Sequence, residues 1–318
     1  MMRAAVLTAP GRVELADIDL PSPGPDEVRI RLEGCGVCGS NLPPFEGRTW
    51  FTYPFAPGAP GHEGWGRVDA VGRNVRDLRE GDRVAALSGH AYADYDVAPR
   101  GSVVKLPPVL EGRAFPGEAL GCAVNVFRRS GVRAGQWVAV VGAGFLGTLL
   151  VQLARSAGAR VIAFGRRRFA LQLARDAGAE HTLPLSPRAE VLKAVQSLTA
   201  GAWCDVAIEC AGAQEPLDLC GELLRHRGRL VIAGYHQDSP RPVNLQLWNW
   251  RGLDVINAHE RDPAVCAEGV RIAMDAVARG QLNPSALYTH SFPLEELPRA
   301  LAALRDRPEG FLKALVTT

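Results

Sequence analysis

The sequence lacks any long uninterrupted apolar run. Its apolar stretches are short and broken by glycine or charge, whereas a membrane-spanning helix needs roughly 18 such residues in a row. The opening stretch, MMRAAVLTAPGRVELADIDL, has no apolar core of the kind found in a secretory signal peptide. The sequence therefore predicts a protein without a membrane segment, located in the cytoplasm.

An excess of charge of one sign is also lacking. The chain has 36 Lys and Arg against 34 Asp and Glu, a formal net charge of +2. Such a balance creates no field that would recruit nucleic acid or an anionic membrane, so a small molecule is the expected partner. Gly (34) and Pro (23) together make up about 18% of the 318 residues, below the roughly 25–30% that is typical of low-complexity chains. At roughly 150 residues per domain, 318 residues indicate about two folded domains.

The seven cysteines are odd in number and unevenly spread, so a complete disulfide framework is impossible. Because the number is odd, they cannot all pair, and reduced thiols are expected. Cys35-x-x-Cys38 resembles half of a structural zinc ribbon or a redox pair. However, no second CxxC exists, and the pair does not start a helix beside a βαβ unit. We favour Cys38 as a metal ligand and Cys35 as a thiol packed within a strand.

The hydrophobic pattern of the sequence changes near residue 120. Before it, short alternating segments such as 28–32 and 91–97, separated by Pro- and Gly-rich turns, indicate a β-rich half. After it, apolar strands alternate with helical patterns, which predicts βαβ units, a parallel sheet and an α/β fold. The expected strands are 137–141, 160–164, 204–209, 229–233 and 288–292, and the expected helices include 169–177, 264–279 and 294–304.

A glycine-rich loop joins strand 137–141 to the next helix. It reads Gly142-Ala143-Gly144-Phe145-Leu146-Gly147. In a dinucleotide site the first Gly allows the tight turn, the second lets the backbone approach the pyrophosphate, and the third packs helix on strand. Because strand, loop, helix and second strand occur in order, the motif favours a dinucleotide site over a glycine-rich turn without a ligand.

The turn after strand 160–164 carries no carboxylate. NAD sites usually place Asp or Glu there, about 20 residues on, to bind the ribose 2′-hydroxyl, but this turn reads Gly165-Arg166-Arg167-Arg168. Arg166 and Arg167 are predicted to pair with a 2′-phosphate, and so to favour NADP(H) over NAD(H). The alternative is that the arginines form a solvated helix start.

Four scattered residues are of the types that bind zinc. They are Cys38 in GVCGS, His62 and Glu63 in PGHEG, and Glu118 in GEAL. A thiolate, an imidazole and a carboxylate can hold a catalytic Zn²⁺ and leave one position open for water or substrate. Spacing alone does not show that they converge, and a lone histidine is more often a core or surface residue.

Seven motifs in order carry a resemblance. They are CGVCGSN, PGHEGWGRVDAVG, EGDRV, GEALGC, VAVVGAGFLG, IECAG and the closing FLKALV. Together they resemble the zinc-dependent medium-chain dehydrogenase/reductase family of the alcohol, sorbitol and threonine dehydrogenase type. The resemblance implies a GroES-like catalytic domain over 1–122, a Rossmann domain over 123–261, and a C-terminal segment, 262–318, that returns to the first domain.

The resemblance also assigns roles. It implies that Cys38 and His62 bind a catalytic zinc, that Glu63 exchanges on and off the metal, and that Glu118 is the third protein ligand. Ser40 would pass the alcohol proton. The implied activity is hydride transfer between NADP(H) and an alcohol or carbonyl substrate, in a homodimer joined through the edge of the Rossmann sheet.

The sequence departs from the family in three places. No four-cysteine lobe follows Gly81-Asp82-Arg83-Val84, which predicts one zinc and not two. Asn41 replaces the usual Asp after Ser40; it can orient a neighbour but adds no charge. Pro43 stands where several members have a relay histidine. Two alternatives remain: a zinc-free quinone or enone reductase of the same superfamily, and a non-enzymatic NADPH-binding protein with a vestigial metal site.

Overall fold

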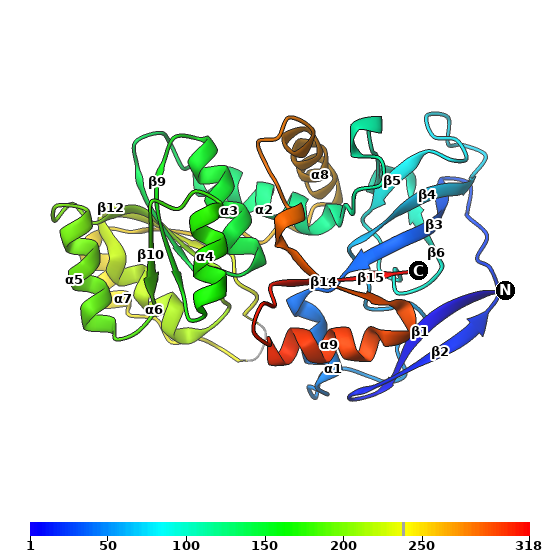
Figure 1. Cartoon of the computed structure of the whole chain (residues 1–318), viewed down its shortest axis with the longest axis horizontal. Helices are drawn as coiled ribbons and strands as arrows, with labels where there is room; N and C mark the ends of the chain where they lie inside the picture. Colours follow the sequence, from blue (N-terminus) through cyan, green and yellow to red (C-terminus); the bar gives the residue numbers. More distant parts are fainter. Residues whose placement is uncertain (237–238) are drawn as a thin grey trace. The chain divides into compact units, whose positions relative to one another are not determined.

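The computed structural model describes residues 1–236 and 239–318, which divide into two compact units (Figure 1). Unit 1 contains Met1–Cys122, Arg261–Gly280 and Pro284–Thr318, and unit 2 contains Ala123–Glu260 and Gln281–Asn283. Arg261, predicted in the Rossmann domain, groups with unit 1, and residues 281–283, predicted in the C-terminal segment, group with unit 2.

Unit 1 is built on β-strands from both ends of the chain. Its seven-stranded sheet has the order β14-β15-β3-β4-β5-β7, with β6 also paired to β3. The last strand runs antiparallel to β3, with Val316 opposite Cys35, so the C-terminal segment completes the sheet that the first segment begins. The strands of this sheet are β3 Glu27–Gly36, β4 Gly64–Val71, β5 Arg83–Ala86, β6 Tyr95–Pro99, β7 Val103–Lys105, β14 Tyr288–Pro293 and β15 Lys313–Thr317. A separate two-stranded sheet pairs β1 Met2–Ala9 with β2 Arg12–Ile18.

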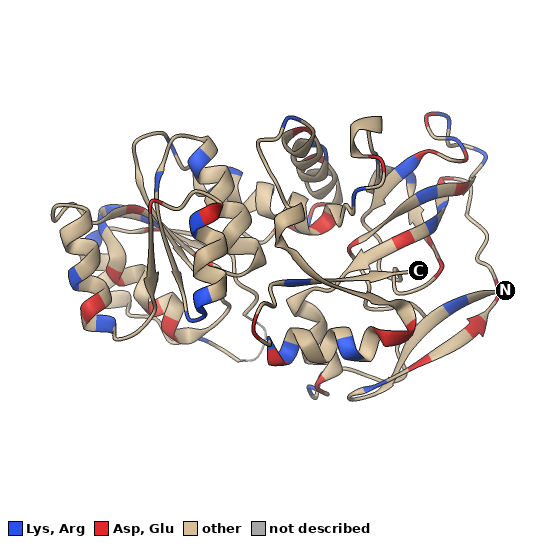
Figure 2. Ribbon diagram, viewed as in Figure 1, with Lys and Arg blue, Asp and Glu red and all other residues tan. Residues whose placement is uncertain are grey.

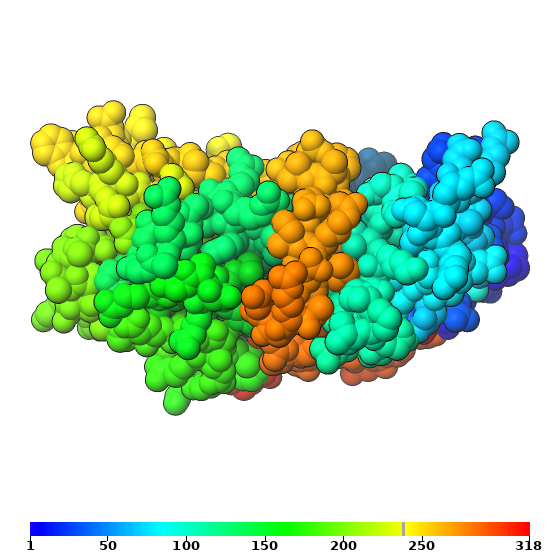
Figure 3. All heavy atoms as spheres, turned by 90° about the horizontal axis from the view of Figure 1, so that it is seen from above, coloured from blue at the N-terminus to red at the C-terminus, as the bar shows by residue number. Residues whose placement is uncertain are grey.

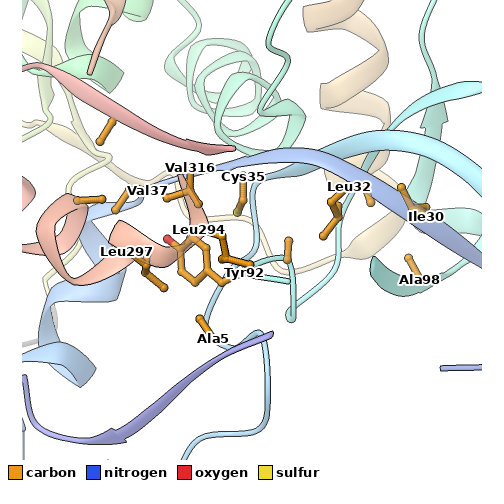
Figure 4. Close-up of a cluster of buried hydrophobic side chains, with 14 of the residues drawn as sticks. Ala5, Ile30, Leu32, Cys35, Val37, Tyr92, Ala98, Leu294, Leu297 and Val316 are labelled. Atoms are coloured by element: carbon orange, nitrogen blue, oxygen red, sulfur yellow. The ribbon is translucent and has the colours of Figure 1, made fainter. Parts of the chain in front are cut away.

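Alternation along β3 explains its place in the sheet. Val28, Ile30 and Leu32 are buried, as the period of two residues predicts. The strand predicted over 91–97 is only partly correct, because β6 begins at Tyr95. The buried residues Ala91 and Tyr92 instead form a loop, whose backbone bonds Gly61, Gly58 and Ala5. Figure 4 shows the Tyr92 ring within the core of unit 1, between Leu294 and Ala5.

Helices cover the sheet of unit 1 with spaced apolar residues. In α9, Leu297, Ala300, Leu301 and Leu304 are buried at helical spacing. Figure 3 shows the orange segment of α8 next to blue-green residues. A Cβ on Gly121 would lie 2.8 Å from the Val270 backbone nitrogen of α8, so glycine allows the close approach of α8 at this point. The helices are α1 Leu42–Phe45, α8 Pro263–Ala278 and α9 Leu297–Asp306, and the 3₁₀ turns are η1 Gly39–Asn41, η2 Arg100–Ser102, η3 Pro108–Leu110, η4 Ser285–Leu287 and η5 Leu294–Glu296. The helix α2 Gly117–Ser130 begins in unit 1 and continues into unit 2 from Ala123.

Unit 2 is a parallel sheet with helical crossovers, which confirms the predicted α/β architecture. The order β10-β9-β8-β11-β12-β13 makes β8 and β11 neighbours, and the direction of winding reverses between them. Ligands of such sheets bind beyond the carboxyl ends of the strands at this switch point. The elements are β8 Trp137–Val141, α3 Phe145–Ser156, β9 Arg160–Gly165, α4 Arg168–Asp176, β10 His181–Pro184, α5 Arg188–Leu198, β11 Cys204–Glu209, α6 Gln214–Leu223, β12 Leu224–Ile232, α7 Leu245–Arg251 and β13 Asp254–Asn257.

The surface carries charges of both signs. Figure 2 shows Lys and Arg interspersed with Asp and Glu along the helices and strands. In the described part of the chain, no helix has both the length and the apolar character needed to cross a bilayer.

Candidate functional site

Three potential metal ligands converge in unit 1. Cys38 lies directly before η1, and His62 and Glu63 directly before β4. One ligand atom from each of the three lies within 4.8 Å of the other two, and no other group of this kind occurs among the described residues. We call Cys38, His62 and Glu63 the metal cluster. Thiolate, imidazole and carboxylate are the donors that zinc takes in proteins, so the cluster fits this ion.

Backbone hydrogen bonding orients the His62 ring. Nδ1 lies 2.8 Å from the Pro60 carbonyl oxygen, which can only accept, so Nδ1 carries the hydrogen. Nε2 lies 3.5 Å from Ser40 Oγ and is left to bind a metal. Ser40 is half-buried in η1, within reach of the ring that would hold the ion.

The surroundings of His62 are anionic. Burial lowers the pKa of the imidazole, but Cys38, Glu118 and Glu63 together raise the pKa to about 10. A site that holds a proton this strongly attracts positive charge, and a metal cation can take the proton's place.

Glu118 lies in the first turn of α2. Burial raises the pKa of its carboxyl group, and the charge of His62 opposes that shift. It therefore acts on the imidazole electrostatically, although it is not one of the three residues of the metal cluster. Glu118 is thus close enough to influence the metal cluster, but the structure does not place it among the potential ligands that converge there.

The carboxylate of Glu63 is held by a lysine that the sequence analysis did not identify. Lys313 Nζ in β15 lies 2.8 Å from Glu63 Oε1 and 2.6 Å from Oε2, and both side chains are buried. Burial lowers the pKa of Lys313, but Glu63 and Cys38 raise it above its ordinary value, so the amine stays charged. A Cβ on Gly36 would lie 1.8 Å from Glu63 Oε2, which explains the first of the two glycines in CGVCGSN.

The glycine-rich loop of unit 2 has the geometry of a phosphate site. Gly142 has a φ of +116°, which favours glycine, and a Cβ on Gly147 would lie 2.0 Å from the Gly142 carbonyl oxygen. A Cβ on Gly144 would meet nothing within 4 Å, so the backbone there is open to a ligand. Phe145 and Leu146 begin α3, whose first N–H groups and dipole favour an anion.

The turn after β9 places arginines at the carboxyl edge of the sheet. Gly165 is buried at the end of β9, Arg166 is exposed, Arg167 is half-buried, and α4 begins at Arg168. A Cβ on Gly165 would lie 3.1 Å from Ala143 Cβ and 3.2 Å from Leu171 Cδ2. Any larger residue there must displace its neighbours by a few tenths of an ångström.

Two family models match the chain. Residues 24–108 match the alcohol dehydrogenase GroES-like domain, and residues 146–271 match the zinc-binding dehydrogenase domain. The sorbitol dehydrogenase of Halalkalibacterium halodurans is 26% identical over 340 residues, covering 96% of each protein.

Solved structures share the fold of the whole chain. A putative zinc-binding dehydrogenase from Sinorhizobium meliloti, bound to NADP, has a TM-score of 0.87 at 28% identity and covers 100% of this chain and 99% of its own. A mycobacterial quinone oxidoreductase has a TM-score of 0.84 at 24% identity, with 100% of both chains covered, which shows the fold alone. The matching domains, the metal cluster in unit 1 and the glycine loop in unit 2 agree: this chain belongs to the zinc-dependent medium-chain dehydrogenase/reductase family of oxidoreductases.

Proposed function

We propose that the protein is a zinc-dependent dehydrogenase or carbonyl reductase that transfers hydride between NADP(H) and an alcohol or carbonyl substrate. The observation that carries the proposal is the metal cluster, because it brings together a thiol, an imidazole and a carboxylate from two separate segments. The glycine loop of unit 2 supplies an independent site for a dinucleotide.

One zinc ion is assigned to Cys38, His62 and Glu118, with Glu63 as an exchangeable fourth donor. Lys313 already neutralises the charge of Glu63, so thiolate and Glu118 carboxylate provide two negative charges for a doubly charged ion. When bound, zinc would act as a Lewis acid that lowers the pKa of an alcohol or polarises a carbonyl.

Ser40 is assigned the proton transfer. The Ser40 hydroxyl lies 3.5 Å from His62 Nε2, the nitrogen that is left to bind a metal. It can therefore reach a substrate oxygen held next to that nitrogen. General acid–base transfer from a positioned group contributes about 10²–10⁴-fold. Ser40→Ala is expected to reduce turnover by that order, and Ser40→Thr, which retains a hydroxyl, to restore most of it.

Arg166 and Arg167 are assigned to the 2′-phosphate of NADP(H). They follow β9 at the carboxyl edge of the sheet, in a turn over 165–168 whose own residues include no carboxylate that would oppose a phosphate. The nicotinamide of the bound dinucleotide would accept or donate the hydride.

The experiment that tests the function combines metal analysis with turnover. The purified protein, supplied with zinc, should hold one equivalent. It should oxidise members of a panel of polyols, aliphatic alcohols and aromatic alcohols with NADP⁺, and lose this activity with a chelator. Reduction of quinones or enones that survives complete zinc removal would favour the zinc-free reductase. Tight NADPH binding without turnover of any substrate would favour a binding protein with a vestigial metal site.

The third ligand has its own test. Glu118→Ala should lower zinc content and turnover together, whereas Glu63→Gln should leave the zinc content near one. If Glu118→Ala changes neither, Glu63 or water fills the third position. Cys38→Ser should abolish turnover while unit 2 remains folded and still binds NADPH.

We further propose a homodimer formed through β13. This strand ends the sheet of unit 2, and Leu245, Trp250 and Val255 around it are exposed, Trp250 by 80%. Antiparallel pairing of β13 with its copy would set Val255 opposite Ile256 and Asp254 opposite Asn257, with no like charges facing. Light scattering should give a dimer that Trp250→Glu converts to a monomer; a monomeric native protein would contradict it.

An odd number of cysteines, seven in all, is expected to consist of reduced thiols, so we assign the protein to the cytoplasm. Fractionation of the source cells is the direct test.

A further inference from the structure

A buried carboxylate of unit 2, Glu209, belongs to neither the metal cluster nor the glycine loop. It is the last residue of β11 and is 0% exposed. It pairs with Val141 of β8, so it lies at the switch point of the sheet. A carboxylate this deeply buried needs partners for its oxygens, because desolvation without them is costly.

Both oxygens of Glu209 have hydrogen-bond partners. Oε1 accepts the backbone N–H groups of Ala211 and Gly212, at 2.7 and 2.8 Å, and so holds the loop that follows β11. Oε2 lies 2.9 Å from Nε2 of His236, which belongs to the segment that follows β12. The same carboxylate therefore joins two loops at the carboxyl edge of the sheet.

Arg241 determines which nitrogen of His236 carries the hydrogen. Its Nε donates to Nδ1 of the ring at 3.1 Å, and its Nη2 donates to the Gly212 carbonyl oxygen at 3.1 Å. Because a guanidinium only donates, Nδ1 must accept, and the one hydrogen of the neutral ring lies on Nε2 and points to Glu209. The imidazole is thus a neutral bridge between an anion and a cation.

The loop after β11 packs against the glycine loop. A Cβ on Gly142 would lie 3.0 Å from the Cys210 carbonyl carbon and 3.1 Å from the Ala211 nitrogen. The loops after β11 and β12 also approach each other closely, since a Cβ on Gly212 would lie 2.6 Å from the Tyr235 carbonyl oxygen. A shift of the loop after β11 would therefore reach the tight turn at which a dinucleotide places its pyrophosphate.

We propose that Glu209, His236 and Arg241 are positioning residues for NADP(H), which hold the loops after β11 and β12 in the shape that receives the dinucleotide. Both bonds of the imidazole involve a charged partner, and such bonds are stronger than those between neutral groups. A loop that is fixed before the cofactor arrives loses less conformational freedom on binding. The inference rests on the proposed function, because it requires that unit 2 bind NADP(H).

An amide cannot replace the Glu209 carboxylate. In Glu209→Gln a single side-chain oxygen faces three donors, two backbone N–H groups and the Nε2–H of His236. Whichever way the amide turns, its NH₂ group meets a donor, and Arg241 opposes movement of the ring hydrogen to Nδ1. The change is isosteric, so it tests hydrogen bonding and not packing.

The experiment compares NADPH binding by the native full-length protein, Glu209→Gln, His236→Leu, His236→Gln and His181→Leu. His236→Gln keeps a donor and an acceptor, whereas His236→Leu has neither. His181 is the matched control, because its Nε2 also lies near a glutamate, 3.7 Å from Glu180, but at the amino end of β10.

Three quantities are measured. Fluorescence titration gives the dissociation constant for NADPH, and elemental analysis gives the zinc content. A two-bond ¹H–¹⁵N spectrum of protein labelled with ¹⁵N-histidine gives the tautomer of His236, whose signals are identified by their loss in His236→Gln.

We expect Glu209→Gln and His236→Leu to weaken NADPH binding by about 10–100-fold at unchanged zinc content, and His236→Gln to restore most of the affinity. His181→Leu should match the native protein, and the native His236 ring should carry its hydrogen on Nε2.

Native affinity in folded Glu209→Gln and His236→Leu would overturn the inference and leave the proposed function intact. If neither variant folds, the native tautomer decides, because a hydrogen on Nδ1 contradicts the bridge between Glu209 and Arg241. A native protein that binds no NADPH would overturn both the inference and the proposed function.

Discussion

At the scale of single residues, a metal ion that binds the cluster must displace the proton on His62. Thiolate and carboxylates raise the pKa of this imidazole to about 10, against an ordinary value of 6.5. Because the folded-state pKa is the higher one, the charged ring stabilises the metal-free protein fully below about pH 6.5. That stabilisation is lost as the pH rises through about 10.

Zinc uptake at neutral pH should therefore release protons. We expect the metal-free protein to release at least one proton per zinc at about pH 7.5, and its zinc affinity to increase as the pH rises toward 10. Calorimetric titrations in buffers with different ionisation enthalpies give the number. His62→Gln should release fewer protons, whereas His90→Gln, an exposed site, should match the native protein. Zinc uptake that leaves the proton balance unchanged would contradict this account.

The candidate ligands could be predicted from the sequence one by one, but their surroundings could not. Cys38, His62 and Glu63 stand in short glycine-containing motifs that indicate their chemistry. Asn41 could be recognised as a departure from the family, yet its hydrogen bonds to Tyr92 and Pro60 depend on tertiary packing, which brings these residues close to it. A hydrogen-bond partner that comes from another segment leaves no local pattern to read.

At the scale of elements, the turn between β9 and α4 is predicted to select the cofactor. Its backbone is still extended at Arg167, and α4 begins at the next residue. Arg166 and Arg167 therefore precede the helix, and Arg168 belongs to it. A charge-assisted hydrogen bond contributes about 1.5–3 kcal/mol, so one or two correspond to roughly ten- to several-hundred-fold preference.

Replacing Arg166 and Arg167 together by alanine should remove this preference. We expect kcat/KM with NADPH to fall relative to kcat/KM with NADH by ten- to several-hundred-fold, and Arg168→Ala to change the ratio little. The arginine variants are a cleaner test than Gly165→Asp, because a Cβ at Gly165 would already crowd Ala143. Equal use of both cofactors by the native protein would show that the arginines are a solvated helix start.

The type of an element could be predicted where its hydrophobic period agreed with the elements that flank it in the sequence. Three parallel strands of unit 2 occur where they were predicted, as β8, β9 and β11. The strand predicted over 229–233 is longer, since β12 begins at Leu224, and the short strands β10 and β13 were not predicted. The segment 91–97 misled because alternation also suits a buried loop: Ala91 and Tyr92 face the core, but their backbone bonds other loops and the β1 strand in an irregular pattern. Local periodicity reports burial, and burial alone does not make a strand.

At the scale of the whole molecule, Glu63 and Lys313 join parts of the chain 250 residues apart. The lysine lies within FLKALV, but nothing in that motif points to a partner so far away. Removing one member of a buried ion pair typically costs about 3–5 kcal/mol, because the remaining charge stays buried without compensation.

Lys313→Met should destabilise the metal-free protein by about 3–5 kcal/mol, measured by denaturant unfolding at neutral pH. Combining it with Glu63→Gln should recover much of the loss, because the double variant buries no unpaired charge. Lys105→Met, which breaks the partly exposed pair with Asp82, should cost about 1 kcal/mol or less. Additive effects of the two changes at Glu63 and Lys313 would show that the pair does not couple.

The discontinuous composition of unit 1 has a consequence for biosynthesis. A ribosome adding about 5–20 residues per second needs about 12–50 s to proceed from Glu63 to Lys313, and it makes all of residues 123–260 in that interval. Once residue 118 has been added, the nascent polypeptide contains Cys38, His62 and Glu118. A chain stalled between residues 118 and 313 would thus carry every proposed zinc ligand but lack the ammonium group that balances Glu63.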